Sequence, residues 1–238
     1  RIIQNAALFR RIDAVYQARE TAKLTPEQKR LTVIRWNAFV RGGAQLGPAA
    51  KTRLAEINGE LAGAYTTFSQ NLLIDETNYV LYLTEADLSG LPADVRAAAA
   101  AAAAERKHPG EFAILNTRSS VDPFLTYADR RDLREKVWTT FYNRGDNGDA
   151  RDNNAVIKKI LKLRAERAKL LGFPPHAHWR LANNSMADTP QAAMDLMLRV
   201  WPAATARVRE EVAEMQAIAD REGKGVKIAP WDYRYYAE

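Results

Sequence analysis

Residues 127–172 read YADRRDLREKVWTTFYNRGDNGDARDNNAVIKKILKLRAERAKLLG, and their pattern decides the fold class. Two apolar stripes at helical spacing flank a short turn rich in Asp and Asn. We predict one helix after an N-cap at Asp129 and a second after an N-cap at Asp152, ended by Gly145 and Gly172. The stripes are formed by Leu133, Val137, Trp138 and Phe141 in the first helix and by Val156, Ile160, Leu163 and Leu170 in the second. This pattern predicts a helical hairpin at the centre of an all-α protein.

Similar apolar spacing continues through most of the chain. Start signals, end signals and periodicity predict further helices over residues 2–20, Thr25–Arg41, Pro48–Leu72 and Asp188–Gly223. Pro202 lies inside the last of these, and we expect a kink there because proline removes a backbone donor and clashes with the preceding turn.

Two short β-prone runs interrupt the helical pattern. They comprise Tyr79–Leu83 and Phe112–Leu115, on either side of an alanine-rich helix that includes Ala97–Ala104 and that we interpret as a surface helix. The predicted fold class is therefore mainly all-α, a helical bundle with a small two-stranded β insert. We expect residues 1–238 to form a single helical domain.

Composition limits the environment of the chain. Hydrophobic residues make up 47%, yet no apolar run approaches the roughly 20 residues of a membrane span, so no membrane partner is expected. The sequence has no cysteine, which excludes disulfides and thiolate metal sites. A cytoplasmic location fits this composition, with the periplasm as the alternative.

Two histidines are the first candidates for a metal site. His176 and His178 are two positions apart, so they point to different sides of a helix and share a metal only in an extended segment. Tetrahedral zinc would need a further ligand, and neither cysteine nor an H-E-x-x-H motif supplies one. We therefore expect these histidines to lie at a helix start beside Trp179, with no catalytic or metal-binding residue in the chain.

The Asp-rich turn resembles a calcium loop only in composition. In Asp146–Asp149, followed by Asp152 and Asn153, the glycine comes third rather than sixth and no glutamate closes the loop. Turn and helix-capping roles explain these residues. The sequence also lacks the nucleophile-elbow, P-loop and dinucleotide-binding motifs. The carboxylates of Glu210, Glu211 and Glu214 are expected on a solvated helix face.

A net charge of +6 raises the possibility of nucleic-acid binding. Basic side chains concentrate in the second helix of the opening stretch, at Lys158, Lys159, Lys162, Arg164, Arg167 and Lys169. Elsewhere basic and acidic residues interleave, and no aromatic platform accompanies the charge. A solvated basic surface is the preferred interpretation, and nucleic acid is an unlikely partner.

Ten motifs in order resemble a known family. They are LFRRIDAVYQAR (8–19), LTPEQKR (24–30), FVRGGAQL (39–46), RLAEINGELAGAYTTFSQNLL (53–73), DLSGLPADV (87–95), FLTYADRRDLREKVW (124–138), NRGDNGDARDN (143–153), LRAERAKLLGF (163–173), SMADTP (185–190) and PWDYRYYAE (230–238). In this order they resemble the bacterial peptidyl-dipeptidases, or dipeptidyl carboxypeptidases, of the thimet oligopeptidase, neurolysin and oligopeptidase A family. The segments RSSVDPF (118–124) and HPGEF (108–112) depart from the family pattern.

The resemblance implies a large, two-lobed, nearly all-α zinc metallopeptidase that removes dipeptides from the carboxyl end of oligopeptides. In that family an H-E-x-x-H motif and a further glutamate hold the zinc, downstream of the PWDYRYY motif. This sequence contains no H-E-x-x-H, so no catalytic, metal-binding or substrate-binding residue is carried over.

The expected role follows from this absence. We expect the chain to be an upstream, non-catalytic part of the peptidase, inactive alone, binding no zinc, and partnered by the oligopeptide substrate and a missing downstream catalytic portion. Surface meant for that portion should be apolar, near Trp231, Tyr233 and Tyr236 or along the Pro202 helix, and should promote self-association. The alternative is a stand-alone basic helical scaffold or nucleic-acid-binding protein.

Overall fold

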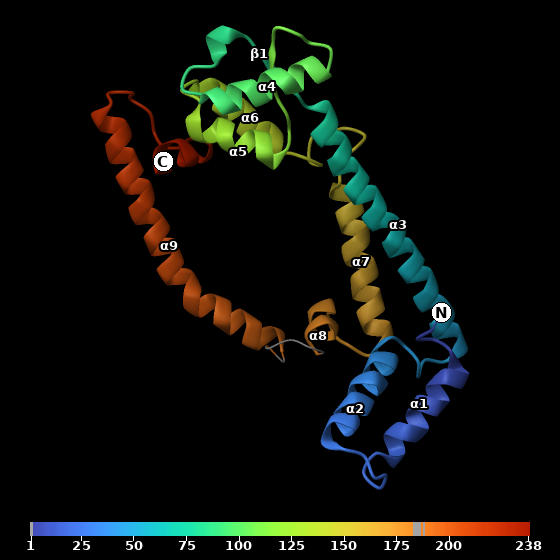
Figure 1. The fold of residues 1–238 in the computed structure, drawn as a ribbon. Helices are drawn as coiled ribbons and strands as arrows, with labels where there is room; N and C mark the ends of the chain where they lie inside the picture. Colours follow the sequence, from blue (N-terminus) through green and yellow to red (C-terminus); the bar gives the residue numbers. More distant parts are fainter. Residues whose placement is uncertain (1, 183–186, 188) are drawn as a thin grey trace. The chain divides into compact units, whose positions relative to one another are not determined.

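The computed structural model describes residues 2–182, 187 and 189–238, and the chain folds as two compact units. The first unit comprises Arg1–Tyr65 and Ile157–Leu196, and the second comprises Thr66–Val156 and Met197–Glu238. Helices dominate the described part of the chain, with one small sheet (Figure 1). The predicted fold class is confirmed, while a single domain stays a prediction. Asp188, the predicted start of the last long helix, lies outside the described residues, as do Ser185 and Met186 of SMADTP.

The first two predicted helices form as α1 (Ala6–Ala18) and α2 (Pro26–Arg41) of the first unit. Helix α2 begins as predicted, because Thr25 and Gln28 form a reciprocal capping box in front of Pro26. The rings of Tyr16 and Trp36 stack with centroids 4.1 Å apart, which fixes α1 against α2.

Helices α3 (Pro48–Asn78) and α7 (Asn154–Leu170) run antiparallel within the first unit (Figure 1). Arg53 near the start of α3 pairs with Glu166 near the end of α7 at 2.7 Å, and Glu60 pairs with Lys159 further along at 3.7 Å. Apolar residues of both helices are buried, namely Leu54, Ile57, Leu61, Ile160, Leu163 and Ala168. The short helix α8 (His176–Leu181) follows.

The two helices predicted in residues 127–172 form as α6 and α7, and each packs on partners within its own unit, while their packing as a hairpin stays a prediction. Helix α6 (Arg131–Tyr142) packs in the second unit against α5 (Arg118–Tyr127) and the 3₁₀ turn η2 (Pro230–Asp232), whereas α7 pairs with α3. The predicted cap is wrong, because Arg130 is the N-cap of α6 and Asp129 instead accepts hydrogen bonds from Ser89 and Tyr235. Tertiary partners therefore override the local signal.

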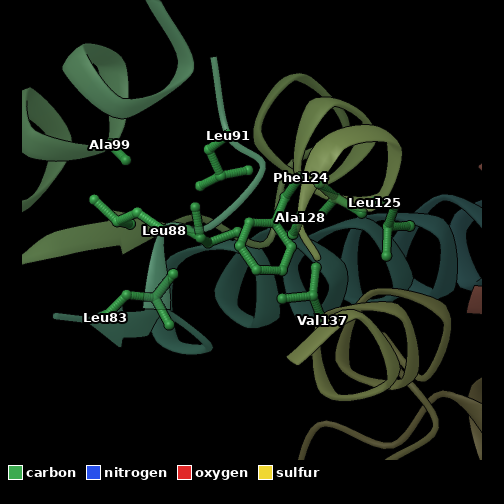
Figure 2. Packing of buried hydrophobic residues seen from close by; sticks show 10 residues of the cluster. Leu83, Leu88, Leu91, Ala99, Phe124, Leu125, Ala128 and Val137 are labelled. Carbon is green, nitrogen blue, oxygen red and sulfur yellow. The ribbon is translucent and has the colours of Figure 1, made fainter. Parts of the chain in front are cut away.

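The second unit is built around a two-stranded sheet. Strand β1 (Leu81–Leu83) pairs antiparallel with β2 (Phe112–Ile114), and Leu81 lies opposite Ile114. A turn, η1 (Glu85–Asp87), and helix α4 (Ala93–Glu105) connect the strands. Figure 2 shows how the cluster that includes Leu83, Leu88, Leu91, Ala99, Phe124, Leu125, Ala128 and Val137 joins the sheet to α4, α5 and α6.

The alanine-rich helix α4 is more buried than the sequence suggests. Ala99 is 5% exposed and Ala103 is fully buried, so one face belongs to the core. The interpretation as a surface helix is therefore wrong for that face. Small side chains allow the helix to lie close to β2 and α5, which a composition-based argument misses.

Helix α5 forms in a segment where no helix was predicted. Its segment contains Pro123, and a proline inside a helix removes one backbone hydrogen bond. The helix forms because Val121, Phe124 and Leu125 enter the core together. Burial of these three side chains stabilises the segment more than the proline destabilises it.

The C-terminal part of the second unit consists of α9 (Pro190–Arg221, of which residues 197–221 belong here), η2 and α10 (Tyr233–Ala237). Helix α9 continues through Pro202, and the kink stays a prediction. Tyr236 of α10 is buried together with Met215 and Ala219 of α9. The PWDYRYYAE segment therefore forms helical turns that pack on α9.

A buried carboxylate shapes the turn between α6 and α7. Asp75 is fully buried and accepts hydrogen bonds from Gly145 N at 2.8 Å, Asn147 Nδ2 at 3.0 Å and Arg151 Nε at 3.2 Å. Gly145 has a φ of +71°, and a Cβ there would lie 2.7 Å from Asn153 Nδ2. Gly145, the predicted end of the first helix, therefore lies in a closely packed turn that has no room for a side chain.

We predict that Gly145→Ala destabilises the protein more than Gly148→Ala. Both positions have positive φ, which costs about 1–2 kcal/mol for a residue with a Cβ, but a Cβ at Gly148 meets open space. Overpacking against Asn153 adds about 1 kcal/mol or more at Gly145. Urea unfolding of both variants measures the difference, and equal destabilisation would contradict this account of the turn.

Candidate functional site

The polar centre of the second unit is a buried ion cluster between α6 and η2. Asp232 is fully buried, and Arg134 is 2% exposed. Arg134 Nη2 donates to Asp232 Oδ1 at 2.8 Å, and Arg131 Nη2 donates to Asp232 Oδ2 at 2.9 Å. The backbone N–H of Ala229 donates to Asp232 Oδ2 at 3.0 Å. The cluster therefore ties η2 to α6 with a carboxylate whose two oxygens are both bonded.

The electrostatics keep this carboxylate charged. Burial alone would raise the pKa of Asp232, but hydrogen bonds from Arg131 and then Arg134 outweigh burial and hold its pKa below the ordinary value of 3.8. Arg134 is held in turn by the carbonyl of Ala128 at 2.7 Å. Each charged group of the pair thus has several partners, as a buried ion pair requires.

A second set of contacts connects the start of α6 with α10. The hydroxyl of Tyr235 donates to Asp129 at 2.9 Å, and the guanidinium of Arg134 lies 4.1 Å from the centroid of the Tyr235 ring. Hydrogen bonds from Ser89 and then Tyr235 outweigh burial and lower the pKa of Asp129. The segment that carries the PWDYRYY motif is therefore fixed to α6 at several points.

An aromatic pocket of about 430 Å³ lies beside this ion cluster. Its walls come from α5, α6 and the η2–α10 segment, with Trp138, Phe141, Tyr142, Trp231 and Tyr233 as the aromatic lining. The Trp138 and Tyr142 rings stack at 4.5 Å, and the Trp231 ring meets Trp138 edge-on at 5.9 Å. The sequence assigns Trp138 and Phe141 to a core stripe but gives no sign of a cavity.

A smaller cavity of about 120 Å³ lies between the sheet and α6. Asn116 lines it and is 2% exposed, and its Oδ1 atom is buried without a hydrogen-bond partner among the described residues. Its amide nitrogen donates to the carbonyl of Asp75 at 3.3 Å, which fixes the orientation of the side chain. The cavity is mainly apolar, and its polar lining consists of Tyr79, Asn116, Lys136 and Thr140.

The two candidate histidines lie in α8, as predicted, beside Trp179. The His176 ring centroid is 5.4 Å from that of Trp179. Burial and the nearby Arg164, Arg167 and Arg180 lower the pKa of His176, so its ring is neutral at pH 7. Within the described ranges, no group of three His, Asp or Glu side chains is placed to hold a metal ion.

The Asp-rich turn performs the predicted turn and capping roles. Asp152 accepts hydrogen bonds from Asn154 N at 2.7 Å and Gly148 N at 3.1 Å. Asp149 accepts from Arg151 N, and Asp146 accepts from Asn154 Nδ2. Asn153 is buried and bonds to the carbonyl of Phe68, so the polar groups of the turn serve its own fold.

The candidate carboxylates on α9 form ion pairs on an exposed face. Arg207 pairs with Glu210 at 3.2 Å and with Glu211 at 3.0 Å, and Glu214 is exposed. Tyr233 donates its hydroxyl to Glu211 at 3.1 Å. These contacts match the predicted solvated helix face and supply no pair of carboxylates with separate acid and base environments.

Several basic residues of α7 are engaged within the first unit. Lys159 pairs with Glu60, and Arg164 Nε donates to the Tyr65 hydroxyl at 2.8 Å. The guanidinium of Arg167 lies 4.6 Å from the Trp179 ring centroid. Lys158, Lys162 and Lys169 complete the predicted basic set. Half of that set therefore stabilises helix packing, which weakens the case for a nucleic-acid surface.

The predicted apolar surface is found along α9 rather than at Tyr236. Tyr236 is 7% exposed because it packs on α9, and Tyr233 is 38% exposed. Trp231 is half-buried. In contrast, exposed apolar side chains follow one stretch of α9, namely Met194, Leu196, Met197, Leu198, Val200, Trp201 and Val208. Self-association through this stretch stays a prediction. None of the described helices is both long enough and apolar enough to span a membrane.

Comparison with known proteins finds similarity to peptidases. The sequence profile of Peptidase family M3 matches residues 124–238. The predicted resemblance is confirmed. The chain is 37% identical over 238 residues to the dipeptidyl carboxypeptidase of Escherichia coli. This alignment covers 100% of this chain and 35% of that protein. It is 32% identical over 222 residues to oligopeptidase A of Salmonella typhimurium, covering 91% and 32% of the two chains.

A plant relative extends this pattern. The probable cytosolic oligopeptidase A of Arabidopsis thaliana is 26% identical over 247 residues, with 100% of this chain and 35% of that protein covered. The chain thus spans about a third of the length of the curated relatives it matches. The M3 match includes α6, η2 and all the aromatic residues that line the pocket between them.

Sequence reasoning misses the residues that form the ion cluster. Asp232 lies within the PWDYRYY motif and Arg134 within the DRRDLREK run, but charged residues are ordinarily solvated. The one signal in the sequence is that Arg134 lies on the same helix face as Val137, so a cation stands among positions predicted to be in the core. Its partner, 98 positions away, is visible only in the fold.

We predict that Asp232→Ala strongly destabilises the second unit. The variant leaves the buried guanidinium of Arg134 without its anion, a change that costs about 3–5 kcal/mol. The control is Asp132→Ala, which removes an exposed partner of Arg130 and should cost about 1 kcal/mol or less. Urea unfolding measures both, and a loss at Asp232 no larger than at Asp132 would contradict the assignment.

The same carboxylate predicts a pH dependence. A depressed pKa in the folded state stabilises the protein above the ordinary pKa of 3.8, and this contribution is lost as the pH falls below that value. Asp232→Asn should therefore show a shallower loss of stability between pH 5 and about pH 3 than the unaltered chain. If stability falls with pH at the same slope in both proteins, the pKa of Asp232 does not differ between the folded and unfolded states, which would contradict this prediction.

Proposed function

We propose that this chain forms a non-catalytic helical portion of a zinc metallopeptidase that releases dipeptides from the carboxyl end of oligopeptides. The observation that carries the proposal is the similarity of all 238 residues to a dipeptidyl carboxypeptidase, at 37% identity, within only 35% of that protein's length. The Peptidase family M3 match over residues 124–238 supports it independently.

The residues of this chain do not fit the zinc site of such an enzyme. The sequence has no H-E-x-x-H motif, and His176 and His178 lie two positions apart on a short helix, where they point to different sides. The described part of the chain also offers no three-residue cluster of ligands. In this proposal zinc belongs to a catalytic portion outside these 238 residues, and the chain alone is inactive.

Two structural features support a role as scaffold. Long helices dominate both units, and the polar clusters at Asp75 and Asp232 fix turns and helix ends, with both oxygens of each carboxylate bonded. The exposed apolar stretch of α9 is surface that a catalytic portion would cover. The partners proposed for the chain are therefore that portion and an oligopeptide substrate.

The test compares this chain with a longer polypeptide from the same gene that contains an H-E-x-x-H motif. Both are assayed for bound zinc by mass spectrometry and for dipeptide release from an oligopeptide with a free carboxyl end. We expect release only from the longer polypeptide, with loss of activity on zinc chelation. Stoichiometric zinc with dipeptide release by residues 1–238 alone, or a zinc-loaded longer polypeptide that releases no dipeptide, would overturn the proposal.

A further inference from the structure

The aromatic pocket between α6 and α10 has the properties of a binding site. Its volume of about 430 Å³ falls within the range of about 300–1,000 Å³ that is typical of ligand pockets. Its lining is mainly aromatic, and it lies in the second unit on elements that the Asp232 cluster holds together. The pocket is therefore formed by fixed walls.

The aromatic side chains are arranged to receive another ring. Tyr142 is 60% exposed although it stacks on Trp138, and the Phe141 ring meets Tyr142 edge-on at 5.6 Å. Aromatic pairs favour offset-stacked and edge-to-face contacts, which a ligand ring can continue. An exposed, stacked tyrosine at a cavity is a larger apolar surface than solvation alone favours.

Polar groups beside these rings suit a peptide backbone. Arg234 and Asp122, which also line the pocket, form an ion pair at 3.1 Å, so a donor and an acceptor stand side by side. The indole Nε1 of Trp231 is buried without a hydrogen-bond partner among the described residues. Because that atom is buried, the polar contacts available to a ligand in the pocket are those of Arg234 and Asp122.

We propose that this pocket binds an aromatic side chain of a peptide segment. The ring would stack within the aromatic lining near Tyr142 and Trp231, and the adjoining peptide groups would bond to Arg234 and Asp122. The inference rests on the proposed function in one respect, since an oligopeptide-cleaving protein meets such segments. It assigns a contact to the chain that needs neither zinc nor cleavage.

The test uses N-acetyl-L-phenylalaninamide as the probe and N-acetyl-L-alaninamide as the matched control. The chain contains five tryptophans, and their indole N–H resonances are assigned by Trp→Phe variants. We expect saturable shifts of the Trp138 and Trp231 resonances with the phenylalanine probe and none with the alanine probe. Trp201, which is 67% exposed on α9, reports non-specific binding.

Variants locate the binding. Tyr142→Ala should weaken binding of the phenylalanine probe roughly three- to tenfold, while Tyr142→Phe, which retains the ring, and Trp201→Ala, outside the pocket, should change it less than about twofold. Circular dichroism verifies that each variant is folded. Equal responses to both probes, a Trp201 shift as large as that of Trp231, or unaltered affinity in Tyr142→Ala would overturn the inference.

The result separates this inference from the proposed function. Absence of probe binding, with normal zinc-dependent dipeptide release by the longer polypeptide, removes the pocket assignment alone. Saturable probe binding in a protein whose longer form releases no dipeptide keeps the pocket and removes the peptidase assignment.

Discussion

The buried ion pair between Asp232 and Arg134 is the constraint on which the second unit depends. Transfer of two charges from water into a protein interior is costly, and attraction offsets that cost only when geometry and hydrogen bonding are nearly complete. Here Arg131 and the Ala229 N–H satisfy the remaining acceptor sites of Asp232. The consequence is positional, because η2 and α10 are fixed on α6 and the walls of the aromatic pocket are fixed with them.

Asp75 applies the same physical device at a different place. Its carboxylate is fully buried and organises the turn between α6 and α7 through a backbone N–H, an amide and a guanidinium. In both clusters a buried acid joins a helix to an irregular segment. Apolar burial holds the helices and the small sheet together, whereas these acids determine where turns and helix ends lie.

Local signals in the sequence predict the elements whose causes are local. The capping box at Thr25 and the proline at position 26 mark the start of α2, and apolar spacing marks α3 and α7. Where partners are distant, prediction fails. Helix α5 forms despite Pro123 because its apolar side chains enter the core, and the N-cap of α6 is Arg130 because Asp129 bonds instead to Ser89 and Tyr235.

The candidate site follows the same division. Motif order predicts the family resemblance that the comparisons confirm, and it places Trp231 and Asp232 in a shared motif. It does not show that Asp232 is buried or that Trp138 and Tyr142 line a pocket, because both facts depend on contacts between residues about 90 or more positions apart. The PWDYRYY motif thus has a structural role of its own, which fixes η2 and α10 on α6.

Native-state hydrogen exchange tests this account most directly. If the Asp232 cluster makes residues 231–236 an integral part of the second unit, their protected amides exchange as slowly as those of α6, at the rate set by cooperative unfolding of that unit. Exchange of residues 231–236 far faster than that of α6 would show a separately fraying segment and would contradict the central claim.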